Sequence, residues 1–438
     1  MSTAAKPPPS SAQIGFWMAV ALVMGNMIGS GVFLLPASLA PFGGVSLIGW
    51  IVSAAGAMLL ALVFVRLARF NPAAGGPYAY TRQAFGDLAG FLVAWGYWIS
   101  VWSGLAALAV AFVGYLDPFI PSLVRAPIPA AIMAVAAIWI LTGVNAWGVR
   151  AAAGVQLVTT VLKIIPLVLV GGAGLFMLEP SHFAIADPSV PGLAKGITAT
   201  ATLTLWAFLG LECATIAAGA IRDPVHNVPR ATLVGTLLAA IIFIVCTAGV
   251  MGVLSPAVLG HSTAPFADAA RKLAGDRAAA FVALGAAIAC FGALNGWVLI
   301  AGQLPLAVAQ DGLFPRVFGQ LSKRGTPAPG MVIGSALATA LVAMNYSRGL
   351  VNLFTFIILL STLGTLVPYA FCSLAGFILQ RARGKGHPLP WSTGAAVVAC
   401  LAFLYSLWAI GGAGAEVISW GFLLLLAGLP VYVWVSRT

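Results

Sequence analysis

The chain has 438 residues, of which 61% are hydrophobic and only 7% are charged. A soluble domain carries about 25% charged residues because water has to wet its surface, so this composition excludes a soluble protein and indicates an all-α membrane protein. The formal net charge of +11 is spread over short connectors, which is typical of a membrane topology signal and not of a nucleic-acid partner.

Twelve apolar segments are long enough to cross a bilayer, which takes about 20 residues. Several are longer, which predicts tilted or broken helices. No polar interval of domain size separates them, so we expect a single transmembrane domain, 13–436, after a cytoplasmic tail, 1–12. The expected spans are 13–40, 44–68, 86–116, 127–147, 151–177, 193–220, 228–254, 278–309, 330–346, 350–380, 390–411 and 415–436.

The basic residues indicate how these spans are oriented. With the N-terminus in the cytoplasm, most of the 21 Lys and Arg residues fall in cytoplasmic connectors, as the positive-inside rule requires. Both termini are therefore expected in the cytoplasm.

The segments after spans two and seven resemble each other. They share a proline, an arginine and a glycine–aspartate pair: Pro77, Arg82, Gly86 and Asp87 in the first, and Pro265, Arg271, Gly275 and Asp276 in the second. Because the two segments lie an odd number of spans apart, they must face opposite sides of the membrane. This predicts two five-span halves of inverted topology, about 13–177 and 193–380, with a binding site at the midplane and extra helices at about 390–436.

The middle of span one is expected to be discontinuous. Gly25, Gly29 and Gly31 each weaken a helix by about 1 kcal/mol relative to alanine, and the polar residues Asn26 and Ser30 stand among them. Amide N–H groups freed near Ser30 and Gly31 would bind a carboxylate, helped by the helix dipole. The alternative is close helix packing through small residues.

Span six is expected to break near Gly210. Glu212 follows this glycine, and an ionisable residue inside a membrane span costs about 2.5–3.5 kcal/mol on insertion scales, so it usually faces a cavity or a partner. Carbonyl groups released by the break would accept an ammonium group. A carboxylate held by span one and an amine held by span six together describe an α-amino acid.

Lys163 is an ionisable residue near the middle of span five. A fixed ammonium beside the break in span one would replace a sodium ion, whereas a titrating one would carry a coupled proton, and the sequence leaves both open. Snorkelling to the interface is a third interpretation, which the central position of Lys163 weakens.

Two tryptophans stand beside a glycine or a polar break. Trp206 precedes Gly210, and Trp297 follows the Asn295–Gly296 pair. Most aromatic residues in spans pack or face lipid, but these two are candidates for the wall of a site and for cation–π contact with a substrate.

The sequence lacks the motifs of other classes of membrane protein. There is no GxxxxGK[ST] loop and no HExxH, GxSxG or metal-spaced His/Cys set, which argues against an ATPase or an intramembrane enzyme. The five cysteines lie in apolar segments and are interpreted as buried small hydrophobes. A channel would not need two broken helices, one suited to bind a carboxylate and the other an amine. No catalytic residue, metal or cofactor is expected.

Several motifs together resemble the amino acid–polyamine–organocation (APC) transporter superfamily, and within it most of all the bacterial arginine/agmatine antiporters. The resemblance implies five plus five inverted helices followed by two more, with helices 1 and 6 discontinuous, in a homodimer of the bacterial inner (plasma) membrane. The matching segments run along nearly the whole chain: 25–36, 72–80, 206–212, 227–229, 311–315 and 366–369.

The resemblance also implies roles for individual residues. Ser30 and Gly31 match positions that take the substrate carboxylate, and the carbonyls of Trp206 and Leu209 match those that receive the α-amine. Other positions implied to bind substrate, with Trp206 and Trp297 as aromatic gates, are Asn26, Ile28, Val101, Leu105, Trp297 and Ser361. Positions implied in coupling or gating are Lys163, Glu212 and the distal-gate residue Tyr97.

The departures from the arginine/agmatine antiporters concern the side-chain pocket. This chain has Leu105, Val101 and Leu108 where those proteins have asparagine, cysteine and methionine. A buried guanidinium needs hydrogen-bond acceptors, and three apolar residues supply none. Lys163 is absent from those antiporters but is similar to a lysine in sodium-independent members of the wider family.

These observations predict a sodium-independent secondary amino acid transporter that works by alternating access, through proton-coupled symport or exchange. The apolar pocket favours a neutral or broad range of amino acids. The alternative is an arginine/agmatine-type antiporter of amino acids and amines, since Trp297 still permits a cationic substrate. Protons, the lipid bilayer and a second copy of the chain are the other expected partners.

Overall fold

The computed structural model describes residues 15–70, 76–147, 149–185, 188–216, 221–345, 350–382 and 392–437. Every regular element in these residues is a helix. The expected cytoplasmic tail, 1–12, lies outside the described residues.

The α-helices are α1 (Phe16–Met27), α2 (Ser30–Leu39), α3 (Val45–Phe70), α4 (Pro77–Phe85), α5 (Asp87–Gly114), α6 (Pro121–Val124), α7 (Pro127–Trp147), α8 (Val149–Leu175), α9 (Val190–Leu205), α10 (Cys213–Ile216), α11 (Pro224–Val253), α12 (Pro256–Leu259), α13 (Pro265–Gln310), α14 (Ala328–Asn345), α15 (Leu350–Ala382), α16 (Thr393–Gly412), α17 (Ala415–Leu426) and α18 (Gly428–Val435). The 3-10 helices are η2 (Ala40–Phe42), η3 (Pro180–Phe183), η4 (Trp206–Phe208) and η6 (Arg316–Gly319).

Among the described residues, ten helical stretches are long and apolar enough to cross a membrane. The other two expected spans, five and nine, fall on α8 and α14, whose described apolar stretches are Leu162–Leu175 and Ala328–Met344. Each expected span therefore coincides with helix, and the chain is an all-helical multi-pass membrane protein. The largest boundary difference is at span eight, because α13 extends back to Pro265 through a kink.

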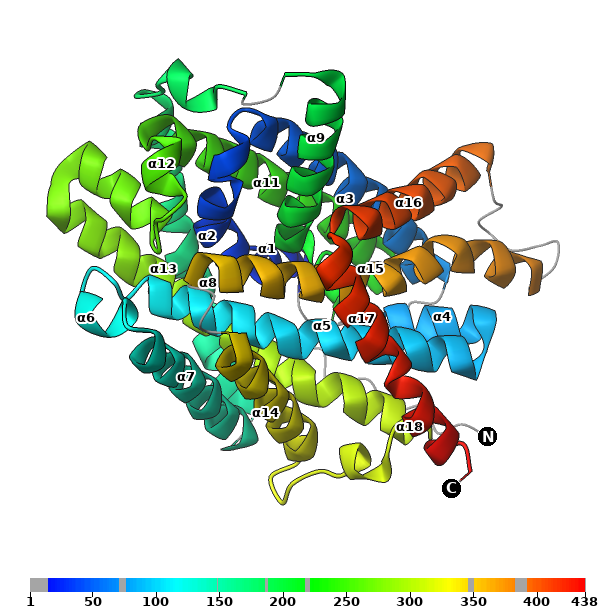
Figure 1. Ribbon diagram of the computed structural model, residues 1–438. Coiled ribbons are helices and arrows are strands. Elements are labelled where there is room, and N and C mark those ends of the chain that lie inside the picture. The colour runs from blue at the N-terminus through cyan, green and yellow to red at the C-terminus, as the bar shows by residue number, and fades with distance from the viewer. Residues whose placement is uncertain are drawn as a thin grey trace.

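Helix α5 is the most deeply buried of these spans. Of its apolar window 94% lies inside the protein, against 11% for the span made by α17 and α18. It packs against α13, α14 and α15, and Figure 1 shows it crossing the middle of the bundle, with α4 at one end and α6 at the other. Lipid is as apolar as the protein interior, so the outer face of α16 and α17 carries exposed side chains such as Leu404 and Phe422.

The repeated sequence motif forms the same local structure twice. Gly86 ends α4 with φ 87° and ψ −177°, and Gly275 interrupts α13 with φ 80° and ψ −174°. Both φ values lie in the region that glycine adopts without steric cost. Beside each glycine an arginine Nε donates to an aspartate Oδ1: Arg82 to Asp87 at 2.7 Å, and Arg271 to Asp276 at 3.0 Å. The two segments therefore share backbone and side-chain geometry as well as sequence, while the division into two inverted halves stays a prediction.

The first copy of the motif ties α4 to the end of α13. Arg82 Nη1 lies 2.9 Å from Asp311 Oδ2, and the Tyr78 hydroxyl donates to the same oxygen at 2.8 Å. The hydrogen bond to Asp87 raises the pKa of Arg82 further above its ordinary value, so the guanidinium stays charged. Burial and the neighbouring Asp311 raise the pKa of Tyr78, so its hydroxyl stays a donor.

Candidate functional site

Span one is interrupted between α1 and α2. Helix α1 ends at Met27, and Ile28 leaves the helical region with ψ 86°. Gly29, with φ −130° and ψ −142°, precedes the first residue of α2, Ser30, and no side chain caps that helix. The Ser30 hydroxyl is buried and has no hydrogen-bond partner among the described residues. The start of α2 therefore offers unpaired donors to an anion.

Span six is interrupted between α9 and α10. Helix α9 tightens into η4, Leu209 is extended (φ −64°, ψ 133°), and Gly210 has φ 105°. The Trp206 carbonyl accepts the Leu209 N–H at 3.2 Å within this turn. In the described part of the chain, the Leu209 carbonyl accepts no hydrogen bond. This carbonyl is thus available to an ammonium group.

The two interruptions lie against each other. A Cβ placed on Gly31 would stand 3.0 Å from the Ala207 Cβ and 3.1 Å from the Trp206 Cδ1. A Cβ on Gly210 would stand 3.0 Å from the Asn26 Cβ. Glycine at both positions lets bare backbone come together, so the donors at the start of α2 face the turn that carries the free carbonyl.

A small cavity lies at this junction. Its volume is about 10 Å³, which is room for about one water molecule. The indole rings of Trp206 and Trp297 stack beside it with centroids 6.4 Å apart and planes at 28°. An amino acid can enter only if these side chains move. The residues that line the cavity are Asn26, Met27, Gly29, Ser30, Gly31, Leu108, Trp206, Leu209 and Trp297.

The three apolar residues of α5 that the sequence placed in the side-chain pocket form one face of this helix beside the cavity. Val101, Leu105 and Leu108 are spaced four and three residues apart, so they share a helical face, and all three are buried. Of the three, only Leu108 lines the cavity. Between them, a Cβ on Gly104 would lie 3.3 Å from the Trp206 ring and 3.5 Å from the Ser361 Oγ, so α5 approaches both the aromatic pair and α15.

Ser361 belongs to a cluster of buried hydroxyl groups. Its Oγ donates to the Ser100 carbonyl at 2.6 Å and lies 3.0 Å from the Ser100 Oγ, which in turn lies 2.5 Å from the Thr365 Oγ1. These contacts join α5 to α15. They make the polar end of an otherwise apolar wall.

Glu212 is completely buried and accepts three hydrogen bonds. The Tyr97 hydroxyl donates to Oε1 at 2.7 Å, and the Tyr369 hydroxyl donates to Oε2 at 2.6 Å. The Gly210 N–H also reaches Oε2, at 3.2 Å. One carboxyl group therefore joins the span-six break to α5 and α15.

Lys163 lies in α8 and is almost fully buried, with 1% of its surface exposed. Its Nζ donates a hydrogen bond to the carbonyl of Gly25, in the last turn of α1. The ammonium therefore stands directly before the interruption of span one. Ile28 lies on this side as well, since it lines a separate apolar pocket beside Lys163 and not the cavity.

The structure brings most of the expected substrate residues together and adds others. Asn26, Ser30, Gly31, Trp206, Leu209 and Trp297 line the cavity. Met27, Gly29 and Leu108 also line it, and Tyr369 completes the Glu212 network. Met27 and Gly29 lie inside the glycine-rich segment already singled out, so its boundaries could have included them. Tyr369 is 157 residues from Glu212, and no local sequence signal links the two.

Comparison with known proteins gives a family and several relatives. A family model described as amino acid permease matches residues 14–436. The cadaverine/lysine antiporter of Escherichia coli (strain K12) is 36% identical over 83% of this chain and 82% of its own length. A putative arginine/ornithine antiporter of Bacillus subtilis (strain 168) is 34% identical over 97% of each chain. The putrescine transporter PotE of Escherichia coli (strain K12) is 30% identical over 97% of each chain.

Proposed function

We propose that this chain, which belongs to the amino acid permease family, exchanges a cationic amino acid for an amine across the membrane. The amino acid and amine transporter class and the absence of an enzyme role follow from the family itself. The substrate is inferred, and it follows the alternative considered from the sequence. Relatives named for lysine and cadaverine, arginine and ornithine, and putrescine support a cationic substrate over a neutral or broad one.

One arrangement carries the proposal. The unpartnered Ser30 hydroxyl at the start of α2 and the unoccupied Leu209 carbonyl line the same cavity. They supply a donor for a carboxylate and an acceptor for an α-amine, which are the two groups that every α-amino acid carries. Stacked Trp206 and Trp297 beside them present aromatic faces that attract a cation.

The wall of α5 supports an alkylammonium side chain more than a guanidinium. Val101, Leu105 and Leu108 offer no acceptor for the five donors of a guanidinium, but they suit the methylene stem of lysine, ornithine, cadaverine or putrescine. The hydroxyl cluster around Ser361 and the tryptophan faces would receive the terminal ammonium. We therefore rank lysine and ornithine, with their diamines, above arginine and agmatine.

The remaining features of the proposal concern the transport cycle. The Lys163 side chain donates to the Gly25 carbonyl beside the span-one break, which supports transport without sodium. The closed Glu212 network and the stacked indoles would open in turn, so the substrate meets one side of the membrane at a time. Twelve spans as two inverted halves, cytoplasmic termini and a bacterial inner membrane complete this proposal; a homodimer remains an expectation from the resemblance.

A competition assay tests the substrate class. Purified protein in cadaverine-loaded liposomes takes up labelled lysine in the presence of an excess of unlabelled lysine, ornithine, cadaverine, putrescine, arginine, agmatine, leucine or serine in the external medium. The proposal predicts strong competition from the first four compounds and none from leucine or serine. Competition by leucine equal to that by lysine would instead support neutral or broad specificity.

A further inference from the structure

Tyr115 lies where three helical segments meet. It caps the C-terminal end of α5 and is completely buried. Its hydroxyl donates to the Phe33 carbonyl of α2 at 2.5 Å, and the Phe266 N–H, in the first turn of α13, donates to the same hydroxyl oxygen at 3.5 Å. The first turn of a helix has no partners of its own for its N–H groups. One hydroxyl group therefore joins the end of α5 to α2 and to the start of α13.

The aromatic rings of these residues pack together around that hydroxyl. The Phe33 ring lies edge-on to the Tyr115 ring, with centroids 5.6 Å apart, and edge-on to the Phe266 ring, with centroids 5.4 Å apart. Each of the three residues is 0% exposed. Edge-to-face contact is a favoured geometry for aromatic pairs. Phe33, Tyr115 and Phe266 therefore form a dry aromatic cluster.

The aromatic cluster stands beyond the cavity on one side. Phe33 follows Ser30 by three residues in α2, and Tyr115 follows Leu108 by seven at the end of α5, so the two members of each pair share a helical face. Ser30 and Leu108 both line the cavity. Tyr97, which binds Glu212, precedes Leu108 in α5 by about three turns. The cavity therefore lies between the Glu212 network and the aromatic cluster.

The repeated sequence motif gives this cluster a counterpart at the opposite end of α5, where α4 lies (Figure 1). The residue after the repeated proline is Tyr78 in the first copy and Phe266 in the second. Tyr78 donates to Asp311, the C-cap of α13, just as Phe266 donates to Tyr115, the C-cap of α5. The first contact is charged, and the Asp311 side chain is 46% exposed, whereas the second is uncharged and buried. The two ends of the bundle are thus held by different chemistry.

We propose that Tyr115 closes the cavity on the side away from Glu212, and that α2 separates from α5 when the bond from Tyr115 to Phe33 breaks. This assignment rests on the proposed function, in which the substrate meets one side of the membrane at a time. The distribution of basic residues places the C-terminal end of α5 on the non-cytoplasmic side. A single neutral hydrogen bond contributes modestly to stability, so this closure can break and reform in every transport cycle.

Alkylation of a thiol placed in the cavity tests the proposal. Ser30→Cys introduces the thiol at a position that lines the cavity. The full-length protein, in right-side-out or inside-out membrane vesicles, is treated with a membrane-impermeant maleimide, and peptide mass spectrometry follows each cysteine. Adding Tyr115→Phe, which keeps the ring and removes the hydroxyl, should raise the labelling rate of the introduced thiol about tenfold in right-side-out vesicles. In inside-out vesicles the rate should not change. Phe33→Leu removes the ring contacts and should act in the same direction, which keeps the test decisive if Tyr115→Phe folds poorly.

Tyr97→Phe gives the matched measurement on the other side of the cavity. It removes a hydrogen bond to Glu212 and should raise labelling in inside-out vesicles only. A rise with Tyr115→Phe alone would support the present proposal and argue against closure by the Glu212 network. A rise with Tyr97→Phe alone would overturn the present proposal. Labelling uses no transported substrate, so either result leaves the proposed exchange of a cationic amino acid for an amine to its own test.

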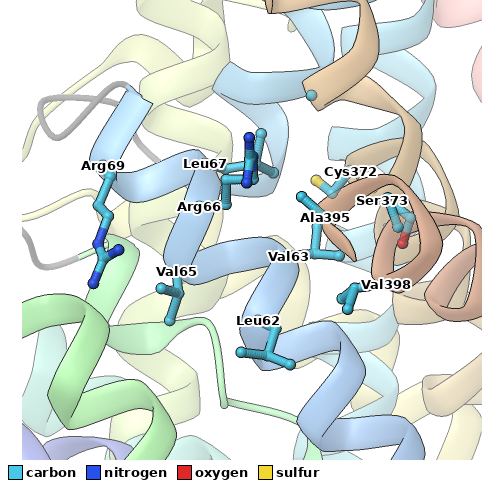
Figure 2. A pocket seen from close by; sticks show the side chains of 12 residues that line it. Leu62, Val63, Val65, Arg66, Leu67, Arg69, Cys372, Ser373, Ala395 and Val398 are labelled. Atoms are coloured by element: carbon cyan, nitrogen blue, oxygen red, sulfur yellow. The ribbon is translucent and has the colours of Figure 1, made fainter. Parts of the chain in front are cut away.

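The natural cysteines report whether a variant loosens the whole fold. Cys246 and Cys372 are buried, and Figure 2 shows Cys372 in a pocket between α3, α15 and α16. Their labelling rates should be the same with and without Tyr115→Phe. A parallel rise at these two cysteines, an equal rise of the introduced thiol in both kinds of vesicle, or an unchanged rate with both Tyr115→Phe and Phe33→Leu would each overturn the proposal.

Discussion

Gly31 and Ala207 are in direct contact: a Cβ on Gly31 would lie 3.0 Å from the Ala207 Cβ and 3.1 Å from its Cα. Gly31 is the second residue of α2, and Ala207 is the middle residue of η4. The contact therefore joins the two interrupted spans at the point where the cavity lies. It fixes how far the start of α2, which we propose holds the substrate carboxylate, stands from the Leu209 carbonyl, which we propose receives the amine.

Replacing Gly31 with alanine should separate the two interruptions. The contacts at 3.0 and 3.1 Å with the Ala207 Cβ and Cα cannot be relieved by a side-chain rotation, so α2 and η4 must shift. We expect uptake to fall by at least about tenfold, because small displacements of binding groups are costly. Gly143→Ala is the control, since a Cβ there meets nothing within 4 Å. Wild-type uptake by Gly31→Ala protein would contradict the geometry.

Ser30→Ala should distinguish substrates with a carboxylate from those without one. The Ser30 hydroxyl is buried without a partner in the described structure, and a hydrogen bond to a charged group contributes about 1.5–3 kcal/mol. The KM for lysine should therefore rise about tenfold or more, while that for cadaverine, which lacks a carboxylate, should change little. Ser406→Ala, which removes a buried hydroxyl bonded within α16, serves as the control. A parallel rise for both substrates would place Ser30 outside the carboxylate site.

The interruption of span one was predictable because its signal is local. Three glycines with Asn26 and Ser30 stand within seven consecutive positions of an apolar segment, and the structure places Met27, Ile28 and Gly29 at the end of α1 and the start of α2. Span six has a weaker signal, which consists of Gly210 and Glu212. The structure nevertheless has η4 and the extended Leu209 at the break that these two residues predict. In both cases a residue that disfavours a helix sits beside a polar one that lipid would not accept.

Tyr369→Phe should loosen the closure around Glu212. The Tyr369 hydroxyl donates to the buried carboxyl at 2.6 Å, and losing such a bond favours opening by about tenfold. Cys213, next to Glu212 and buried, should then be alkylated about tenfold faster, as measured by mass spectrometry with the exposed Cys400 replaced by serine.

The control for this experiment is Tyr405→Phe. The Tyr405 hydroxyl is also buried but has no hydrogen-bond partner among the described residues, so its loss should leave the rate of Cys213 alkylation unchanged. If both variants react like the wild type, the tyrosine–glutamate contacts do not hold the path closed.

Lys163→Met should reduce transport without unfolding the protein. The variant removes the ammonium that donates to the Gly25 carbonyl at the end of α1, leaving that carbonyl without its donor at a cost of about 1–3 kcal/mol. We expect uptake to fall about tenfold and to lose any response to a pH gradient. Lys272→Met is matched to it, because Lys272 Nζ also donates to a backbone carbonyl, that of Val253, at 2.7 Å. Normal pH-driven uptake by Lys163→Met protein would remove Lys163 from the mechanism.

The distant contacts of the site could not be predicted from the sequence. Tyr369 meets Glu212 across 157 residues, and Gly104 faces Ser361 across α5 and α15, pairings that depend on how the helices cross. The sequence likewise placed Ile28 with the substrate residues, whereas the structure directs it towards the pocket beside Lys163. The direction of a side chain around the helix axis decides which cavity it lines, and this direction changes from one residue to the next. Apolar composition does not specify it.

The most direct test of the central claim is counterflow in proteoliposomes. Vesicles loaded with cadaverine, with leucine or with buffer are placed in sodium-free medium containing labelled lysine, and initial uptake is measured. The account predicts rapid lysine uptake into cadaverine-loaded vesicles and only background uptake into leucine-loaded or buffer-loaded ones. Equal stimulation by internal leucine, or lysine uptake that needs sodium and ignores internal cadaverine, would contradict exchange of a cationic amino acid for an amine.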